Sequence, residues 1–298
     1  MSEVSVIVPS FRGGKFLREA IASVRAQSLM DWELIIVLDG CDEDLSDIEG
    51  VDSRVRVIRQ DRRGVSIARN VGISHARSDL IALLDDDDRM LPNRLVAQSR
   101  EMRDERVAIC HTQYRYIDGE GNVLRPGDAK ATTYIEFLRN ESKILSATAM
   151  FRKRTFQEMG GYNSLIPFGE GQDFFQRVSR EGEVRFIPEV LYEYRQHESN
   201  VWLGGASGYE ETAWVLRQHL FAARARKDEL SLRAVRYGLS TIPPRRVSGL
   251  LRAASRSRAQ HRVGGLVGAL LLSTLLAPVF TARATYRELK RGGLRGRS

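Results

Sequence analysis

Four consecutive aspartates follow an apolar run near residue 80. Leu80 to Leu84 form a run of five apolar residues, the length expected of a buried strand, and Asp85 to Asp88 come directly after it. In an open α/β sheet, ligands bind at the carboxyl ends of the strands. Adjacent carboxylates repel one another unless a cation neutralises them, and oxygen ligands suit Mg²⁺ or Mn²⁺, which commonly also bind substrate phosphates. The segment therefore predicts a sheet edge that binds metal and phosphate. The alternative is a solvated acidic turn in which Asp88 caps a helix.

Strand-like and helix-like segments alternate through the first part of the chain. Short apolar runs occupy residues 4–8, 32–38, 55–58 and 80–84, and apolar residues recur at helical spacing between residues 16 and 27 and again from residue 67. This alternation predicts βαβ units and a parallel sheet. A glycine-rich dinucleotide fingerprint does not follow the first run, which argues against NAD or FAD as a cofactor. Further short strands are expected at 107–111, 148–151 and 184–188, and a hairpin around Asp118 and Gly119 is expected at 114–123.

The charge of the chain is unevenly distributed. The 298 residues carry a net charge of +8, but residues 245–298 hold 12 Lys or Arg and a single acid, so the remainder is mildly acidic. This asymmetry indicates an anionic surface as the partner of the basic segment. Two cysteines, Cys41 and Cys110, form no spaced pair, which argues against a disulfide framework or a cysteine-ligated zinc and fits a reducing cytoplasm. The first residues also lack the features of a signal peptide.

Five segments between residues 4 and 200 match one set of motifs in order and spacing. Residues 64–72 read G-V-S-I-A-R-N-V-G against the pattern G-x-S-x-A-R-N-x-G. Residues 4–11, 27–37, 84–92 and 194–197 resemble V-S-V-I-I-P-x-Y, Q-S-x-x-D-x-E-I-I-V-V, L-D-A-D-D-x-x-x-P and Y-R-x-H. In these motifs the chain resembles family 2 glycosyltransferases. The resemblance implies an α/β GT-A fold, a Rossmann-like mixed sheet flanked by helices, and transfer of a sugar from a nucleotide-diphosphate donor.

The resemblance also assigns roles to individual positions. It implies that a divalent ion, Mn²⁺ or Mg²⁺, is held by Asp85, Asp87 and His197 and bridges the donor phosphates. The expected contacts to the nucleotide sugar come from Pro9, Phe11, Asp39, Arg69, Asp85 and Asp86. Asp39 matches the acid that accepts a hydrogen bond from the base, and its alternative is a plain turn aspartate. Arg69 is expected either to pair with a phosphate or to cover the sheet.

One position departs from the family pattern. An inverting transferase needs a general base, which the family places in an E-D-x-D-F-F-x-R segment. Residues 170–177 read E-G-Q-D-F-F-Q-R, so Gly171 stands where the catalytic aspartate is usual. Glu170 is the preferred replacement because it is the adjacent carboxylate, and Asp173 is the second candidate. The third explanation is a protein that binds nucleotide sugar without transferring it.

The C-terminal part of the chain is expected to be a separate appendage. The predicted domains are a GT-A domain at 1–204, a helical extension at 205–244 and a basic, hydrophobic tail at 245–298. Residues 263–282 contain no charged side chain and are flanked by basic residues, which predicts a helix that spans a membrane or lies on an anionic one. The alternative is a helix packed against the catalytic domain or at a dimer interface.

The predicted function is a metal-dependent, inverting glycosyltransferase of cell-surface polysaccharide or glycoconjugate synthesis. Its expected partners are a nucleotide-diphospho-sugar, a glycan or lipid-linked acceptor and an anionic membrane surface, with no nucleic acid, and its expected location is the cytoplasm at the inner face of the membrane. Three other functions are considered: a non-catalytic nucleotide-sugar-binding protein on the same fold, a nucleotidyltransferase, and a nucleic-acid-binding protein. The sequence argues against a nucleotidyltransferase, because no glycine-rich, lysine-containing loop follows Val8.

Overall fold

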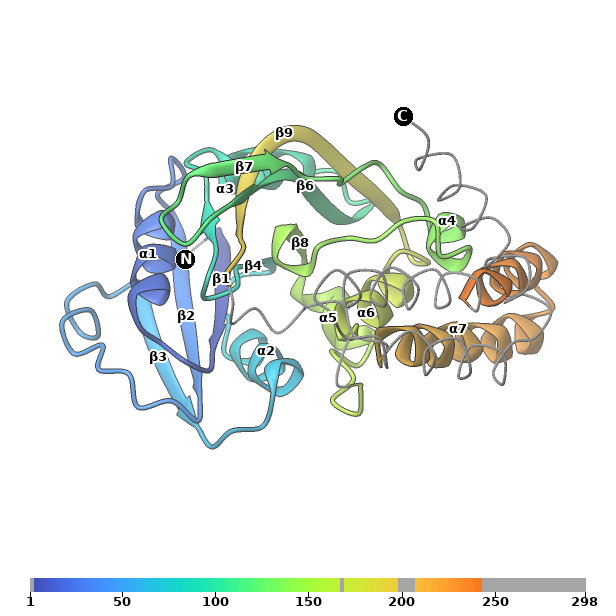
Figure 1. Cartoon of the computed structure of the whole chain (residues 1–298), viewed down its shortest axis with the longest axis horizontal. Helices are drawn as coiled ribbons and strands as arrows, with labels where there is room; N and C mark the ends of the chain where they lie inside the picture. Colours follow the sequence, from blue (N-terminus) through green and yellow to red (C-terminus); the bar gives the residue numbers. More distant parts are fainter. Residues whose placement is uncertain (1–2, 167–168, 198–206, 243–298) are drawn as a thin grey trace, which may run out of the picture. The chain divides into compact units, whose positions relative to one another are not determined.

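The structure, a computed structural model, describes residues 3–166, 169–197 and 207–242 (Figure 1). These residues belong to two compact units. The first contains the described residues up to Phe137 and from Ser142 to His197, and the second contains Leu138–Glu141 and residues 207–242. The predicted domain boundaries at 204 and 244, the basic tail 245–298 and the apolar segment 263–282 lie outside the described residues.

The first unit is built on one mixed sheet of nine strands in the order β3-β2-β1-β4-β8-β6-β9-β5, with β7 paired to β6. The parallel part comprises β1 (Val4–Ser10), β2 (Trp32–Asp39), β3 (Val55–Gln60) and β4 (Leu80–Leu83). The remaining strands are β5 (Arg89–Met90), β6 (Val107–Ile117), β7 (Val123–Pro126), β8 (Ala149–Arg152) and β9 (Glu183–Arg195). The pairs β4–β8, β8–β6, β6–β7 and β9–β5 are antiparallel. The predicted mixed sheet is therefore confirmed.

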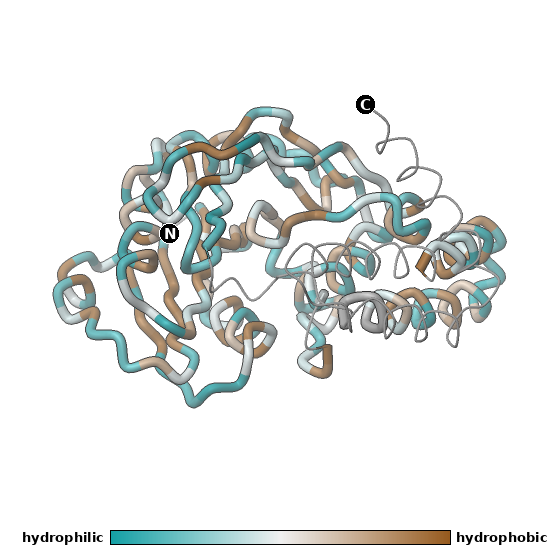
Figure 2. Tube along the Cα trace, in the orientation of Figure 1, coloured by the Kyte–Doolittle hydropathy of each residue, from teal (hydrophilic) through white to brown (hydrophobic). Residues whose placement is uncertain are grey.

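Helices cover both faces of this sheet, so its central strands are apolar on both sides. Val4, Val6 and Val8 of β1 pack in the cluster that includes α1 (Lys15–Arg25) and α3 (Arg94–Glu101), while Ile7 points to the opposite cluster. That second cluster includes α2 (Val65–Ser74), α5 (Lys153–Glu158) and α6 (Glu170–Val178). The alternation follows the two-residue period of a strand, and the central strands accordingly carry hydrophobic colouring in Figure 2.

Glycine at position 72 permits close packing of α2 on the sheet. A Cβ atom there would lie 2.6 Å from Cγ2 of Ile7 and 3.2 Å from Cγ2 of Val37. The helix would have to move away from β1 and β2 to accommodate a larger residue. Because α2 also carries Arg69, this contact fixes the distance of that side chain from the sheet edge.

Strand β9 is longer than the 184–188 segment expected from sequence. It pairs in parallel with β6 from Glu183 to Arg195, and the register shifts between the partners of Thr112 and Gln113, where Pro188 and Glu189 have no paired residue. Proline is tolerated at such an irregularity because it donates no ladder hydrogen bond. The extension carries β9 past the acidic turn after β4.

The second unit is helical. It contains α7 (Ser207–Arg226), a further helix at residues 229–242, and Leu138, the last residue of α4 (Tyr134–Leu138). Asp228 caps the further helix, because its Oδ1 accepts a hydrogen bond from the backbone N–H of Ser231 (3.0 Å). Within the described part of the chain, no helix is both long and apolar enough to cross a membrane.

Candidate active site

Three parallel strands end at one edge of the sheet and bring polar residues together there. Ser10 is the last residue of β1, Asp39 is the last residue of β2, and Asp85 follows β4 after Leu84. The hydroxyl of Ser10 donates a hydrogen bond to Oδ2 of Asp86 (2.5 Å), so the ends of β1 and β4 are in direct contact. The expected polar sheet edge is therefore present.

The first three aspartates of the acidic turn (Asp85 to Asp88) face different partners. Asp85 Oδ1 accepts a hydrogen bond from Arg69 Nη2 (2.8 Å), Asp86 accepts one from Ser10, and Asp87 Oδ2 lies 3.1 Å from His197 Nε2. The structure thus brings two of the three predicted metal ligands, Asp87 and His197, together, while Asp85 is turned toward Arg69. Among the described residues, no group of three or more His, Cys, Asp or Glu side chains is arranged to hold a metal ion.

Asp88 is buried against β9 and does not cap the next helix. It is fully buried, and it accepts hydrogen bonds from Tyr192 Oη (2.6 Å) and from the backbone N–H of Arg195 (2.7 Å). The Arg195 guanidinium in turn donates to the backbone oxygen of Asp87 (2.8 Å). The next helix, α3, begins only at Arg94. Asp88 therefore ties the acidic turn to β9, and the alternative of an exposed helix-capping turn is wrong.

Negative charge in the acidic turn is poorly compensated. Burial, together with the charges of Asp87 and Asp85, raises the pKa of Asp86 to about 7 against the opposing hydrogen bond from Ser10. Burial and the charge of Asp85 also raise the pKa of Asp87, against the effect of His197. A divalent cation would stabilise the charged form of Asp86 and of Asp87, and carboxylate oxygens are suitable ligands for such an ion. The chemistry of these side chains fits a metal ion, although their arrangement forms no complete ligand set.

Arg69 connects the acidic turn to α6. Its side chain is almost fully buried, and Nη1 donates to Glu170 Oε1 (2.5 Å) while Nη2 donates to Asp85 Oδ1. Burial alone would lower the pKa of Arg69, but the charges of Asp85 and Glu170 outweigh it and raise that pKa. Arg69 therefore bridges two carboxylates at the site, where sequence reasoning expected a phosphate contact or a cover for the sheet.

Asp39 holds the loop between β3 and α2. Its buried carboxylate accepts hydrogen bonds from Gln60 Nε2 (2.8 Å) and from the backbone N–H groups of Arg63 (2.7 Å) and Gly64 (2.8 Å). A carboxylate offers about four acceptor positions. Three are used here, which leaves room for one more donor such as a base N–H.

The wall beside Asp39 contains an arginine that sequence reasoning missed. The Arg62 guanidinium lies over the Phe11 ring, with its carbon 3.8 Å from the ring centroid. Phe11 is partly exposed, whereas Pro9 is buried within β1 and is paired with Val37 of β2. The only sequence signal for this cation is that Arg62 and Arg63 immediately precede the G-x-S-x-A-R-N-x-G segment.

The two candidate bases on α6 have different surroundings. Glu170 is the first residue of the helix, and its only partner among the described residues is Arg69 on Oε1, so Oε2 accepts no hydrogen bond there. Asp173 is buried and pairs with Arg177 (2.7 Å), whose guanidinium also donates to the backbone oxygen of Gly161 (2.7 Å). The structure thus links Glu170 to the acidic turn and uses Asp173 to brace the loop before α6.

Gly171 is in close contact with a residue from another segment. A Cβ atom at Gly171 would lie 1.8 Å from Ser146 Oγ and 3.1 Å from Ser146 Cβ. Ser146 belongs to the short helix Ser146–Thr148 that precedes β8. No sequence motif marks Ser146, because the contact joins positions that are distant along the chain.

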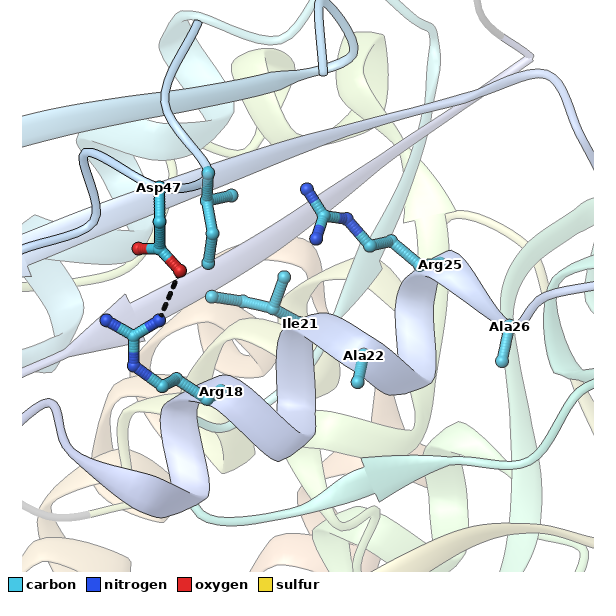
Figure 3. A pocket seen from close by; sticks show the side chains of 7 residues that line it. Arg18, Ile21, Ala22, Arg25, Ala26 and Asp47 are labelled. Carbon is cyan, nitrogen blue, oxygen red and sulfur yellow. Dashed lines mark hydrogen bonds and ion pairs between the residues drawn. The ribbon is translucent and has the colours of Figure 1, made fainter. Parts of the chain in front are cut away.

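A surface groove on α1 is separate from these residues. Its volume is about 490 Å³, and Arg18 and Asp47 form an ion pair across it (2.8 Å; Figure 3). The remaining lining residues are Ile21, Ala22, Arg25, Ala26 and Ile48. None of the predicted site residues lines this groove.

Comparison with known proteins matches the motifs to a family. The family described as Glycosyl transferase family 2 matches residues 5–160. A glycosyltransferase of Rickettsia felis is 32% identical over 65% of this chain and 34% of its own length. The O-antigen biosynthesis glycosyltransferase WbnJ of Escherichia coli is 27% identical over 73% of this chain and 89% of its own length. A chondroitin synthase of Pasteurella multocida is 24% identical over 66% of this chain and 21% of its own length. The chain thus spans about a third or less of the Rickettsia and Pasteurella relatives.

Solved structures match the fold. The S. aureus TarS 1-349 structure in complex with UDP-GlcNAc aligns over 98% of this chain and 92% of its own length, with a TM-score of 0.67 and 18% identity. The complex of the same protein with UDP gives a TM-score of 0.64 at 17% identity and covers 100% of this chain and 93% of its own. At this level of identity the likeness concerns the fold, and it confirms the expected GT-A architecture.

Proposed function

Because this chain belongs to glycosyl transferase family 2, whose match covers residues 5–160, we propose that it transfers a sugar from a nucleotide-diphosphate donor to an acceptor hydroxyl. The observation that carries this proposal is the convergence of Ser10, Arg69 and His197 on the acidic turn at the carboxyl edge of the parallel strands. That edge is where an α/β sheet of this kind binds its ligand. The donor diphosphate is assigned to this edge.

The nucleoside of the donor is assigned to the other end of the same edge. Asp39 retains one acceptor position, and the Phe11 ring with the overlying Arg62 supplies a flat, cationic wall beside it. TarS, which shares the fold, has been crystallised with UDP and with UDP-GlcNAc. Uridine diphosphate sugars are therefore the first donors to test.

A divalent ion is the proposed cofactor, as is general in this family. Asp85 and Asp87 would hold it, with His197 beside Asp87 as a further ligand. When bound, the ion supplies Lewis-acid stabilisation of the charge that develops on the departing diphosphate. Binding requires Asp85 to share its carboxylate between Arg69 and the ion, which a carboxylate with two oxygens is able to do.

Glu170 is the proposed general base of an inverting reaction. Its Oε2 is the oxygen available to take the proton of the acceptor hydroxyl as that hydroxyl attacks the anomeric carbon. Arg69 fixes the other oxygen, which orients the carboxylate without occupying both of its oxygens. Asp173 is the second choice, because its carboxylate is buried against Arg177.

The acceptor is proposed to be a glycan or a lipid-linked saccharide of a cell-surface polysaccharide, made at the cytoplasmic face of the membrane. The relatives named as chondroitin synthase and O-antigen biosynthesis glycosyltransferase support this assignment. Gly171 favours one other function, the binding of nucleotide sugar without transfer, because the usual catalytic carboxylate is missing there.

Nucleotide release by the full chain tests the proposal. The purified protein would be incubated with UDP-, GDP- and dTDP-sugars and either Mn²⁺ or Mg²⁺, beside Asp87→Ala and a control, Asp47→Ala, which removes an exposed carboxylate from the α1 groove. We expect metal-dependent release of one nucleoside diphosphate that is lost in Asp87→Ala and kept in the control. Metal-dependent binding of a nucleotide sugar without release, with or without added glycan, would instead establish the non-catalytic function.

A further inference from the structure

The outer side of α7 carries large apolar residues. Val215, Leu216 and Ala223 are buried on the inner side of the helix, whereas Trp214 is 39% exposed and Phe221 is 63% exposed. Trp214 and Phe221 are seven residues apart, so they lie above one another on the outer side. In the part of the chain that the structure describes, α7 therefore has an exposed apolar side opposite its buried one.

The helix at residues 229–242 repeats this arrangement. Its inner residues Leu232, Val235 and Ile242 are buried, while Leu230 is 65% exposed and Tyr237 is 47% exposed, again seven residues apart. Trp214, Phe221, Leu230 and Tyr237 are here called the outer stripe. Large apolar side chains that recur on one side of a helix, in contrast to single exposed ones, commonly mark an interaction surface.

Arginines accompany the outer stripe on both helices. Arg217 and Arg224 follow Trp214 and Phe221 by three residues, and Arg233 lies between Leu230 and Tyr237 at helical spacing; all of them are exposed. The Arg139 guanidinium lies 4.7 Å from the centre of the Tyr237 ring. Between residues 212 and 242 the chain has six Lys or Arg and two acids, Asp228 and Glu229, which both lie at the turn between the helices.

We propose that the outer stripe docks on a membrane surface that contains anionic lipid. Trp, Tyr and Phe favour the boundary between headgroups and acyl chains, and arginines beside them reach the lipid phosphates. The description of this helix reaches Ile242, and the sequence continues into residues 245–298 with 12 Lys or Arg and one acid, so the charge of the following segment has the same sign. A second copy of the chain is a poorer partner, because two such stripes would bring like charges together.

Vesicle binding by the full chain tests this proposal independently of catalysis. Binding would be measured by co-sedimentation with vesicles of phosphatidylcholine alone and with 30% phosphatidylglycerol. We expect binding to the anionic vesicles, reduced about tenfold or more in a Phe221→Ser/Tyr237→Ser variant and in an Arg217→Glu/Arg224→Glu variant. The matched controls are Val51→Ser/Leu165→Ser, which removes two exposed apolar side chains of the first unit, and Lys130→Glu.

The outcomes distinguish vesicle binding by the outer stripe from vesicle binding by residues 245–298, and from association between copies of the chain. Both stripe variants must keep the circular dichroism spectrum and melting temperature of the parent chain. Equal vesicle binding by the parent and both variants would overturn the proposal, as would the absence of binding by the parent. The proposal would also fail if light scattering found a dimer that Phe221→Ser/Tyr237→Ser converts to a monomer, because the stripe would then be an interface between copies.

Discussion

The hydroxyl of Ser146 occupies the space that a side chain at Gly171 would need. The 1.8 Å separation between Ser146 Oγ and a Cβ atom at position 171 is far shorter than van der Waals contact. The family's usual aspartate is absent at position 171, and a serine fills the space that its side chain would take against α6. The two positions must be altered together to recreate the usual arrangement.

Gly171→Asp alone is expected to destabilise the protein and not to raise transfer. Rotation of Ser146 relieves the contact with Oγ, but Ser146 Cβ remains 3.1 Å away, and overpacking of this kind costs about 1–3 kcal/mol. The melting temperature should fall by about 2–4 °C for each kcal/mol in a domain of this size. Ser146→Gly/Gly171→Asp should recover the loss. An unchanged melting temperature in Gly171→Asp would show that the contact with Ser146 does not destabilise this variant.

Glu170→Gln should lower the transfer rate by about 10²-fold or more and leave the fold intact. The amide keeps the hydrogen-bonding shape of the side chain and an acceptor for Arg69, but it does not take the acceptor proton at neutral pH. Asp173→Asn is the matched comparison, since it removes the charge that pairs with Arg177 and should mainly lower the melting temperature. The reverse pattern, a rate loss confined to Asp173→Asn, would transfer the role of base to Asp173.

The sequence located the site better than it predicted the direction of its side chains. The apolar runs and the motifs correctly placed Asp39 and Asp85 at strand ends, because strand length and alternation are local properties, whereas the first strand runs past Pro9 to Ser10. The partners of Asp88, by contrast, are Tyr192 and Arg195, more than 100 residues away. Contacts of this kind depend on how β9 pairs with β6, which no local pattern encodes.

Arg69→Met should destabilise the protein and reduce activity together. The variant leaves Asp85 and Glu170 without their shared cation, and breaking a buried ion pair costs about 3–5 kcal/mol. Arg69→Lys should retain part of both properties, because an ammonium reaches one carboxylate more readily than two. Thermal unfolding and nucleotide release would be measured for both variants beside Arg154→Lys, a change at an exposed arginine. A melting temperature of Arg69→Met equal to that of the parent chain would show that the ion pairs of Arg69 with Asp85 and Glu170 contribute little to stability.

His111 should make the protein less stable as the pH falls from 6.5 toward 4. It is fully buried in β6 beside Phe186, neither ring nitrogen has a hydrogen-bond partner among the described residues, and burial lowers its pKa to about 4. The unfolded chain, in which the pKa is about 6.5, therefore binds a proton that the folded protein excludes throughout this interval. The associated stability is fully present above pH 6.5 and is lost progressively down to pH 4, by up to about 3 kcal/mol.

Carboxylates such as Asp86, whose pKa is raised, act in the opposite direction over part of this pH range, so the effect of His111 must be measured as a difference. The melting temperature of the parent chain and of His111→Phe would be compared at intervals of half a pH unit between pH 7 and 4. The advantage of the parent over the variant should shrink as the pH falls, because phenylalanine has no proton to bind. A difference that stays constant with pH would mean that burial does not hold His111 neutral in the folded protein.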